Sequence, residues 1–178
     1  MKLEELLLID QSRINADHVV EIITQKPELF DTLWSLYLKD EEPVSRRAAW
    51  VMDILTDRMP LLKESQLDLM INLLYEFNHD GLKRHTLKIL ERNNITEKQM
   101  GQLMLICFQW LESPYESAAV KVFCLKILDK IALREPQISR ELIDIIDMQM
   151  SEASPSFKSI GKKVLKKLQK ISANLQSQ

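Results

Sequence analysis

Six cationic side chains recur at a spacing that could build one surface for an anionic ligand. Lysine fills one column of three aligned segments and a cation fills the column four residues later: Lys88, Lys126 and Lys166, then Arg92, Lys130 and Lys170. Residues i and i+4 share one face of a helix, so we expect three successive helices to present a basic ladder two residues wide. Asp53 and Asp57 fill the same columns in a fourth segment, where the ladder would end at an acidic step. The pattern predicts a partner-binding surface for an elongated anionic ligand in the C-terminal half.

The helix dipole offers another explanation for some of these cations. The last turn of a helix favours a positive charge by about 0.3–1 kcal/mol. This effect accounts well for the column of Arg92, Lys130 and Lys170, but less well for the column four residues earlier. The sequence alone therefore leaves the two explanations open.

Charge is also divided unevenly along the chain. Residues 155–178 contain six lysines and no acid, whereas residues 1–154 contain 18 bases and all 26 acids. Such asymmetry is typical of a surface that attracts an anionic partner. It is equally typical of the solvated outer face that a terminal repeat needs.

No arrangement of residues in the sequence indicates a catalytic or metal site. The three histidines, His18, His79 and His85, have no cysteine or carboxylate at a recurring ligand spacing. The sequence has no Gly-rich phosphate loop, no Gly-x-Ser-x-Gly and no His-Glu-x-x-His. With 26 acids, a catalytic carboxylate pair cannot be singled out. We expect no cofactor and no metal, and the sequence favours a non-enzyme.

Composition points to a soluble globular protein. The chain has 178 residues, of which 46% are hydrophobic and 28% charged, with a formal net charge of −2. Glutamates interrupt the N-terminal apolar run, and no window approaches the length of a membrane span. Cys107 and Cys124 lie among apolar neighbours, as reduced core thiols do. These features predict a cytoplasmic protein that does not bind membranes.

Apolar residues recur at helical spacing almost throughout, and prolines separate the periodic segments. Only three glycines are present and no stretch alternates like a strand, so we predict an all-α fold. The expected helices cover residues 2–12, 15–25, 27–39, 43–58, 63–77, 80–92, 96–112, 115–133, 136–151 and 155–174. Three capping sequences support these starts: Thr96 to Gln99, Ser113 to Glu116, and Ser154 before Pro155.

The chain also contains an internal repeat. Segments that end at Leu55, Leu90, Leu128 and Leu168 align, with spacings of 35, 38 and 40 residues. Each segment follows another apolar helix, so the unit is a helical hairpin that buries its apolar face by stacking. We predict one domain with an N-terminal cap at residues 1–26 and hairpins at 27–58, 61–92, 96–133 and 136–174.

The second helix of the first hairpin resembles a HEAT repeat. Residues 42–55 read Glu-Pro-Val-Ser-Arg-Arg-Ala-Ala-Trp-Val-Met-Asp-Ile-Leu. A proline, a segment similar to the Val-Arg pair of the family and small residues come in this order before a leucine. The resemblance implies an α-solenoid (an α-α superhelix) of the HEAT-repeat and armadillo-type family. In this family the second helices line a concave face that commonly holds a protein or nucleic-acid partner.

From this resemblance we expect a non-catalytic scaffold that holds a protein partner, steered by a basic C-terminal half. The chain resembles more remotely the HEAT-like-repeat alkylpurine DNA glycosylases, which pair a tryptophan with an essential aspartate. The pair here, Trp50 and Asp53, departs from that spacing, so no catalytic role is carried over. The first hairpin is acidic and the sequence pI is near 6.0, which disfavours nucleic acid as the partner. Self-association between the acidic body and the basic end remains open, as does the oligomeric state.

Overall fold

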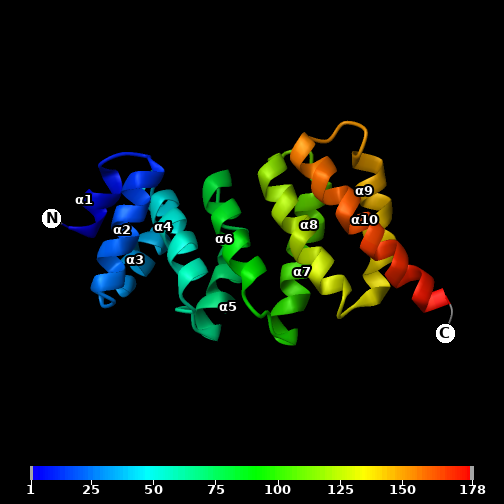
Figure 1. The fold of residues 1–178 in the computed structure, drawn as a ribbon, viewed down its shortest axis with the longest axis horizontal. Helices are drawn as coiled ribbons and strands as arrows, with labels where there is room; N and C mark the ends of the chain where they lie inside the picture. The colour runs from blue at the N-terminus through cyan, green and yellow to red at the C-terminus, as the bar shows by residue number, and fades with distance from the viewer. Residues whose placement is uncertain (1, 177–178) are drawn as a thin grey trace. The chain divides into compact units, whose positions relative to one another are not determined.

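The chain is helical throughout the part that the structure describes, residues 2–176, with side chains described to residue 173. In this computed structural model no strand occurs within those residues (Figure 1). The α-helices and one short 3-10 helix, η1, follow each other along the chain as α1 Leu3–Leu8, α2 Arg13–Gln25, α3 Leu29–Leu38, α4 Val44–Arg58, α5 Glu64–Leu73, α6 Asp80–Arg92, α7 Glu97–Glu112, α8 Ala118–Ala132, η1 Pro136–Ile138, α9 Ser139–Gln149 and α10 Pro155–Gln176. The all-α helical-repeat fold predicted from the periodicity is confirmed.

The helices form two compact units, residues 1–92 (unit 1) and 93–178 (unit 2). Unit 1 contains α1 to α6 and unit 2 contains α7 to α10. The boundary coincides with the end of the second predicted hairpin. The finer division into a cap and four hairpins stays a prediction.

In unit 1, α4 is the central helix. It packs against α2, α3 and α6 and also contacts α1. Small and apolar residues allow this close approach: Ala48, Ala49, Met52 and Leu55 of α4 are fully buried. Nine of the fifteen residues of α4 are buried, among them the polar Ser45 and Asp53. A buried carboxylate needs partners, which α6 supplies as described below.

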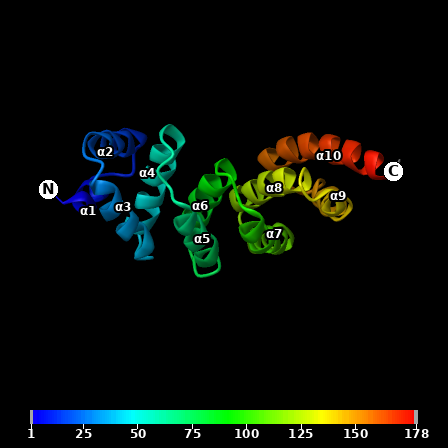
Figure 2. The same ribbon diagram turned by 90° about the horizontal axis from the view of Figure 1, so that it is seen from below.

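In unit 2, α8 packs between α7 and α10, and α10 also packs against α9. Figure 2 shows α10 on the opposite side of α8 from α7. The core contains Leu125 and Leu128 of α8 and Leu142 of α9, each fully buried. Cys107 and Cys124 are buried free thiols, as expected from their apolar neighbours. Burial raises the pKa of Cys107 well above its ordinary value, so this thiol is a packing residue.

Two of the three predicted capping sequences are confirmed. Thr96 precedes α7, and its backbone N–H donates to Oε1 of Gln99 at 3.0 Å. Pro155 begins α10, and Oγ of Ser154 accepts from the N–H of Phe157 at 3.3 Å.

The predicted start of the following helix at residue 115 is wrong. Helix α8 begins at Ala118 with Ser117 as its N-cap, whose Oγ accepts from the N–H of Val120. Oγ of Ser113 instead accepts from the N–H of Tyr115 at 3.2 Å and holds a local turn. Ser113 and Ser117 both fit the capping preference, and the serine next to the apolar stripe of α8 caps the helix.

Two helix ends also differ from the prediction. Helix α1 ends at Leu8, because Oδ1 of Asp10 accepts from the N–H of Ser12 and turns the chain toward α2. Helix α5 ends at Leu73, four residues before the predicted end. Both errors fall at helix C-termini, where apolar residues continue at helical spacing into the turn that follows the helix.

Two glycines inside helices of unit 2 should respond oppositely to substitution. A Cβ on exposed Gly101 of α7 would meet nothing within 4 Å, so Gly101→Ala should raise the free energy of unfolding by about 0.5–1 kcal/mol. A Cβ on buried Gly161 of α10 would lie 3.2 Å from Sδ of Met150 and 3.3 Å from Cγ2 of Ile146. Gly161→Val should therefore lower that free energy by about 1–3 kcal/mol. Urea denaturation measures the free energy of unfolding of both variants. If the two substitutions changed it in the same direction, the packing described for α10 would be contradicted.

Candidate functional site

The six cations of the predicted ladder divide between the two units. Lys88 and Arg92 lie on α6 of unit 1. The other four lie in unit 2, with Lys126 and Lys130 on α8 and Lys166 and Lys170 on α10. A ladder that continues through all three helices stays a prediction.

In unit 1 the two aspartates in the ladder columns, Asp53 and Asp57, form ion pairs with Lys88 and Arg92 of the predicted ladder. The side chain of Asp53 on α4 is 2% exposed, and its carboxylate accepts from three side chains of α6. Nζ of Lys88 and Nδ1 of His85 lie 2.9 and 3.1 Å from Oδ2. Nη1 of Arg92 donates to Oδ1 at 2.7 Å, and Nη2 donates to the backbone carbonyl of Asp53 at 2.7 Å. We call Asp53, His85, Lys88 and Arg92 the Asp53 cluster.

The Asp53 cluster keeps its carboxylate charged despite burial. Burial by itself would raise the pKa of Asp53, but the hydrogen bonds from His85, Lys88 and Arg92 outweigh it and lower the pKa to about 2. Burial also lowers the pKa of His85, although Asp53 opposes this effect. The imidazole stacks on Trp50, with the ring centroids 6.3 Å apart. The cluster therefore joins α4 to α6, and Asp53 offers no open carboxylate for catalysis.

The columns of the repeat could have predicted this pairing. Asp53 and Lys88 occupy equivalent positions in consecutive repeats, as do Asp57 and Arg92. Since α4 and α6 pack against each other, equivalent positions come within reach across the interface. Nε of Arg92 also lies 3.4 Å from Oδ1 of Asp57. The opposite charges at these equivalent positions mark ion pairs inside unit 1.

Acid should destabilise unit 1 through this cluster. His85 binds its proton more weakly in the folded state, so stability falls once the pH drops below the ordinary value of 6.5. Asp53 has its folded pKa below the ordinary 3.8, so its contribution is present above 3.8 and is lost as the pH falls toward 2. Both groups act in the same direction.

The loss can be measured by urea denaturation of the wild type and Asp53→Asn from about pH 5 to pH 2. The advantage of the wild type over Asp53→Asn should shrink as the pH falls from 3.8 toward 2, because Asp53 takes up a proton in the unfolded chain before it does so in the folded protein. A difference that does not change with pH would contradict the charged state assigned to Asp53.

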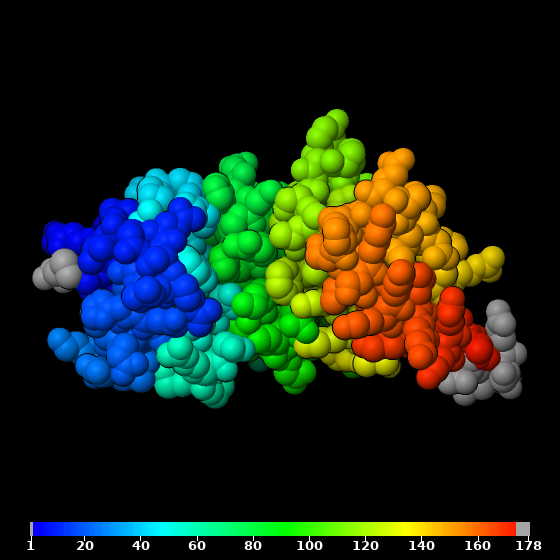
Figure 3. Space-filling model, turned by 45° about the horizontal axis from the view of Figure 1, so that its top comes forward, coloured from blue at the N-terminus to red at the C-terminus, as the bar shows by residue number. Residues whose placement is uncertain are grey.

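The cations of unit 2 form a different kind of surface. Lys162, Lys163, Lys166 and Lys170 are exposed along α10. Lys126 is half-buried, with its Nζ 4.8 Å from the ring centroid of Phe123. Lys167 of α10 pairs with Asp129 of α8, which joins the two helices. Figure 3 shows α10, in orange and red, as a ridge on the surface of unit 2.

Charge in unit 2 is segregated by helix. Helices α8 and α10 carry nine lysines and one acid, Asp129. Helices α7 and α9 carry two cations, Lys98 and Arg140, against five carboxylates. Dipole effects at helix ends do not produce such a division, because lysines also fill the middle of α10. We call the exposed surface of α8 and α10 the basic face.

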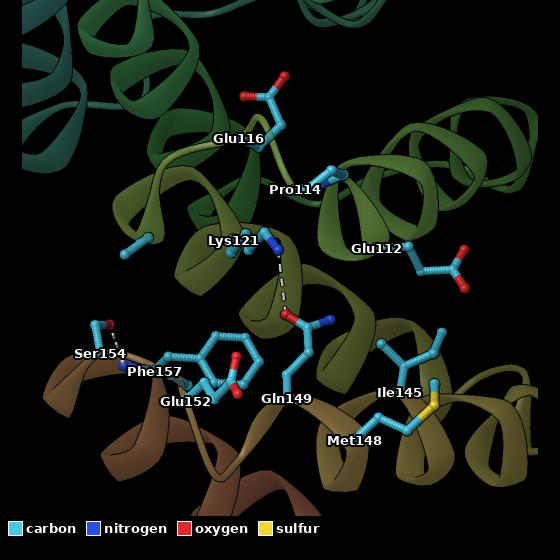
Figure 4. Close-up of a pocket in the computed structure, with 12 residues that line it drawn as sticks. Glu112, Pro114, Glu116, Lys121, Ile145, Met148, Gln149, Glu152, Ser154 and Phe157 are labelled. Atoms are coloured by element: carbon cyan, nitrogen blue, oxygen red, sulfur yellow. Dashed lines mark hydrogen bonds between the residues drawn. The ribbon is translucent and has the colours of Figure 1, made fainter.

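Unit 2 also contains a pocket of about 590 Å³, between the α7–α8 turn and the α9–α10 turn (Figure 4). Its lining includes Ile145, Phe157, Lys121 and Gln149, together with three glutamates. Burial lowers the pKa of Lys121. The sequence did not predict this pocket, since its lining comes from two separate stretches of the chain, residues 112–121 and 145–157.

The described residues contain no group of three or more His, Cys, Asp or Glu side chains that could hold a metal ion. Among the same residues, no helix has the length and apolar character required to cross a membrane.

Comparison with known proteins bears on the whole repeat array. No curated protein and no solved structure gave a match to the chain. The model of the HEAT repeat domain family matches residues 3–168, which include helices of both units. This range agrees with the internal repeat and the packed helices described above. The chain therefore belongs to the HEAT repeat domain family.

Proposed function

We propose that this helical-repeat scaffold binds an acidic protein partner on the basic face of unit 2. The observation that carries the proposal is the segregation of nine lysines and one acid onto α8 and α10. The proposed contact residues are Lys126, Lys130, Lys166 and Lys170. We leave Lys88 and Arg92 out, because the Asp53 cluster already uses both cations inside unit 1.

Several features of the basic face suit a protein partner. A single exposed ion pair contributes at most about 1 kcal/mol, so binding needs many weak pairs or apolar contacts beside them. Phe123 lies half-buried under Lys126 and supplies such an apolar contact. The exposed lysines of α10 would steer an acidic partner toward the face and raise the association rate. HEAT repeat scaffolds often interact with proteins, which agrees with this assignment.

A partner of the nucleic-acid class is less well supported. Contacts to phosphate groups dominate the binding of nucleic acids. The acids of α7 and α9 give the surface of unit 2 both positive and negative charge, which suits phosphates less well. In unit 1, Asp53 is bound within the Asp53 cluster, and Trp50 stacks on the imidazole of His85. The proposal is therefore a binding function without catalysis, and nucleic acid becomes an outcome of its test.

Affinity capture from nuclease-treated lysate of the cells that make the protein tests the proposal. The baits are the wild type, Lys166→Glu/Lys170→Glu on α10, and Lys98→Glu/Arg140→Glu on α7 and α9. The two variants change the net charge equally and alter exposed residues only. Support would be acidic proteins retained by the wild type and the control and lost with the α10 variant. Equal capture by all three baits would contradict it. Capture that is seen in untreated lysate and lost after nuclease treatment would also contradict it.

A further inference from the structure

The pocket of unit 2 has an apolar floor beneath a charged rim. Ile145 of α9 and Phe157 of α10 are buried at its base. Met148, which also lines the pocket, is an apolar residue that is 73% exposed. Apolar side chains left in water beside a pocket are typical of a docking site.

One lysine stands inside the pocket and is held in place. Nζ of Lys121 donates to Oε1 of Gln149 at 3.2 Å (Figure 4). Nε2 of Gln149 donates to the backbone carbonyl of Leu111 at 2.8 Å, which fixes the orientation of the amide. The oxygen of Gln149 must therefore face Lys121. A cationic anchor beside Gln149 would meet the ammonium of Lys121, and an anionic anchor would meet the three glutamates that line the pocket, so a neutral anchor suits the interior best.

The rim has the opposite preference. Glu112, Glu116 and Glu152 line the pocket around Lys121, and Glu112 and Glu152 are exposed. Three carboxylates against one ammonium give the rim an attraction for cations. An incoming segment is thus best matched when its centre is apolar and its flanks are basic.

We propose that this pocket docks a segment of another protein that carries an apolar anchor flanked by lysine or arginine. The anchor would rest on Ile145 and Phe157, and the flanking cations would face Glu112, Glu116 and Glu152. Unit 2 then has two sites of opposite charge preference. This site uses Lys121 of α8 but none of the four proposed contact lysines of the basic face.

Three fluorescent peptides test the chemistry by anisotropy at about 150 mM salt, where long-range effects are screened. The probe is Lys-Lys-Leu-Phe-Lys-Lys, blocked at both ends. In the second peptide glutamate replaces each lysine, and in the third Gly-Ser replaces Leu-Phe. We expect saturable binding of the probe and at least about tenfold weaker binding of each of the other two. Absence of saturable probe binding, or preference for the glutamate peptide, would overturn the proposal.

Two variants test whether the probe occupies the pocket. Ala118 is exposed at the start of α8 and lines the pocket, so Ala118→Trp should fill it and weaken probe binding at least about tenfold. Met148→Ser removes an exposed apolar wall without changing charge and should weaken binding by about threefold. Circular dichroism and the urea midpoint establish that each variant is folded. Unchanged binding to both folded variants would show that the peptide binds elsewhere.

A matched pair of charge variants tests the rim. Glu112→Gln/Glu152→Gln should weaken probe binding by about fivefold. Glu141→Gln/Asp144→Asn removes two exposed charges of α9 outside the pocket lining and should change binding by less than about twofold. Equal effects of the two variants would reduce the interaction to general charge attraction and overturn the proposal.

The experiment also separates this site from other occupants and from the basic face. Lys166→Glu/Lys170→Glu should leave probe binding within about twofold at the same salt. Sedimentation velocity of the full chain at low salt tests a second copy as the occupant. Self-association that Ala118→Trp abolishes would assign the pocket to a second copy and overturn the partner proposed here.

Discussion

Arg92→Met is expected to lower the free energy of unfolding of unit 1 by about 1.5–3 kcal/mol, because the buried carboxylate of Asp53 loses a charged donor and keeps Lys88 and His85. The substitution leaves the carboxylate of Asp53, 2% exposed, without its shortest side-chain partner. It also removes the bond from Nη2 to the backbone carbonyl of Asp53. Hydrogen exchange of α4 and α6, followed by mass spectrometry, measures this loss in unit 1 separately from unit 2.

Lys88→Met is the matched control for this prediction. The side chain of Lys88 is 43% exposed, against 22% for Arg92, so water screens its ion pair with Asp53. We expect a loss of no more than about 1 kcal/mol. Equal losses for the two variants would show that Arg92 has no special role in neutralising Asp53.

A double variant separates charge from packing. In Asp53→Leu/Arg92→Met the buried carboxylate that lost its arginine is itself removed, so this variant should be more stable than Arg92→Met alone. If the double variant were the less stable one, the cost of Arg92→Met would come from lost packing, and the electrostatic account of the cluster would be wrong.

Lys166→Glu/Lys170→Glu is expected to weaken binding of the captured acidic partner by about tenfold or more. Both lysines are exposed on α10, so their reversal replaces attraction with repulsion without disturbing the core. Most of the change should appear in the association rate, and raising the salt should reduce the difference between variant and wild type. Surface plasmon resonance at several salt concentrations measures both quantities.

The control for this second prediction is Lys98→Glu/Arg140→Glu. It changes net charge by the same amount on α7 and α9 and should alter the affinity by less than about twofold at physiological salt. If both variants weakened binding equally, net charge would explain the interaction and the basic face would not.

Local signals predicted the fold well, because helices depend on local periodicity and on their boundaries. The apolar stripe of residues 120–131 and the cap at Thr96 predicted α7 and α8 from neighbouring residues alone. The prediction was wrong at Ser113, where the sequence fits a capping box that the true cap at Ser117, followed three residues later by Val120, lacks. Which serine caps α8 depends on how α8 packs, and packing is not local.

The candidate site was only partly predictable, for the same reason. The repeat columns aligned the cations with one another and with Asp53 and Asp57, but we did not predict from them that Lys88 and Arg92 contact Asp53 in unit 1. That outcome depends on the packing of α4 against α6. The pocket needs two turns and the ends of four helices at once, so no single stretch of sequence indicates it.

Site-specific photo-crosslinking in the cells that make the protein tests the central claim most directly. The photoreactive residue benzoylphenylalanine replaces either Lys166 on α10 or Lys98 on α7, both exposed. We predict that position 166 crosslinks to an acidic protein and that position 98 gives little or none of that product. Crosslinks of equal yield from both positions, or from position 98 alone, would contradict a partner-binding basic face on unit 2.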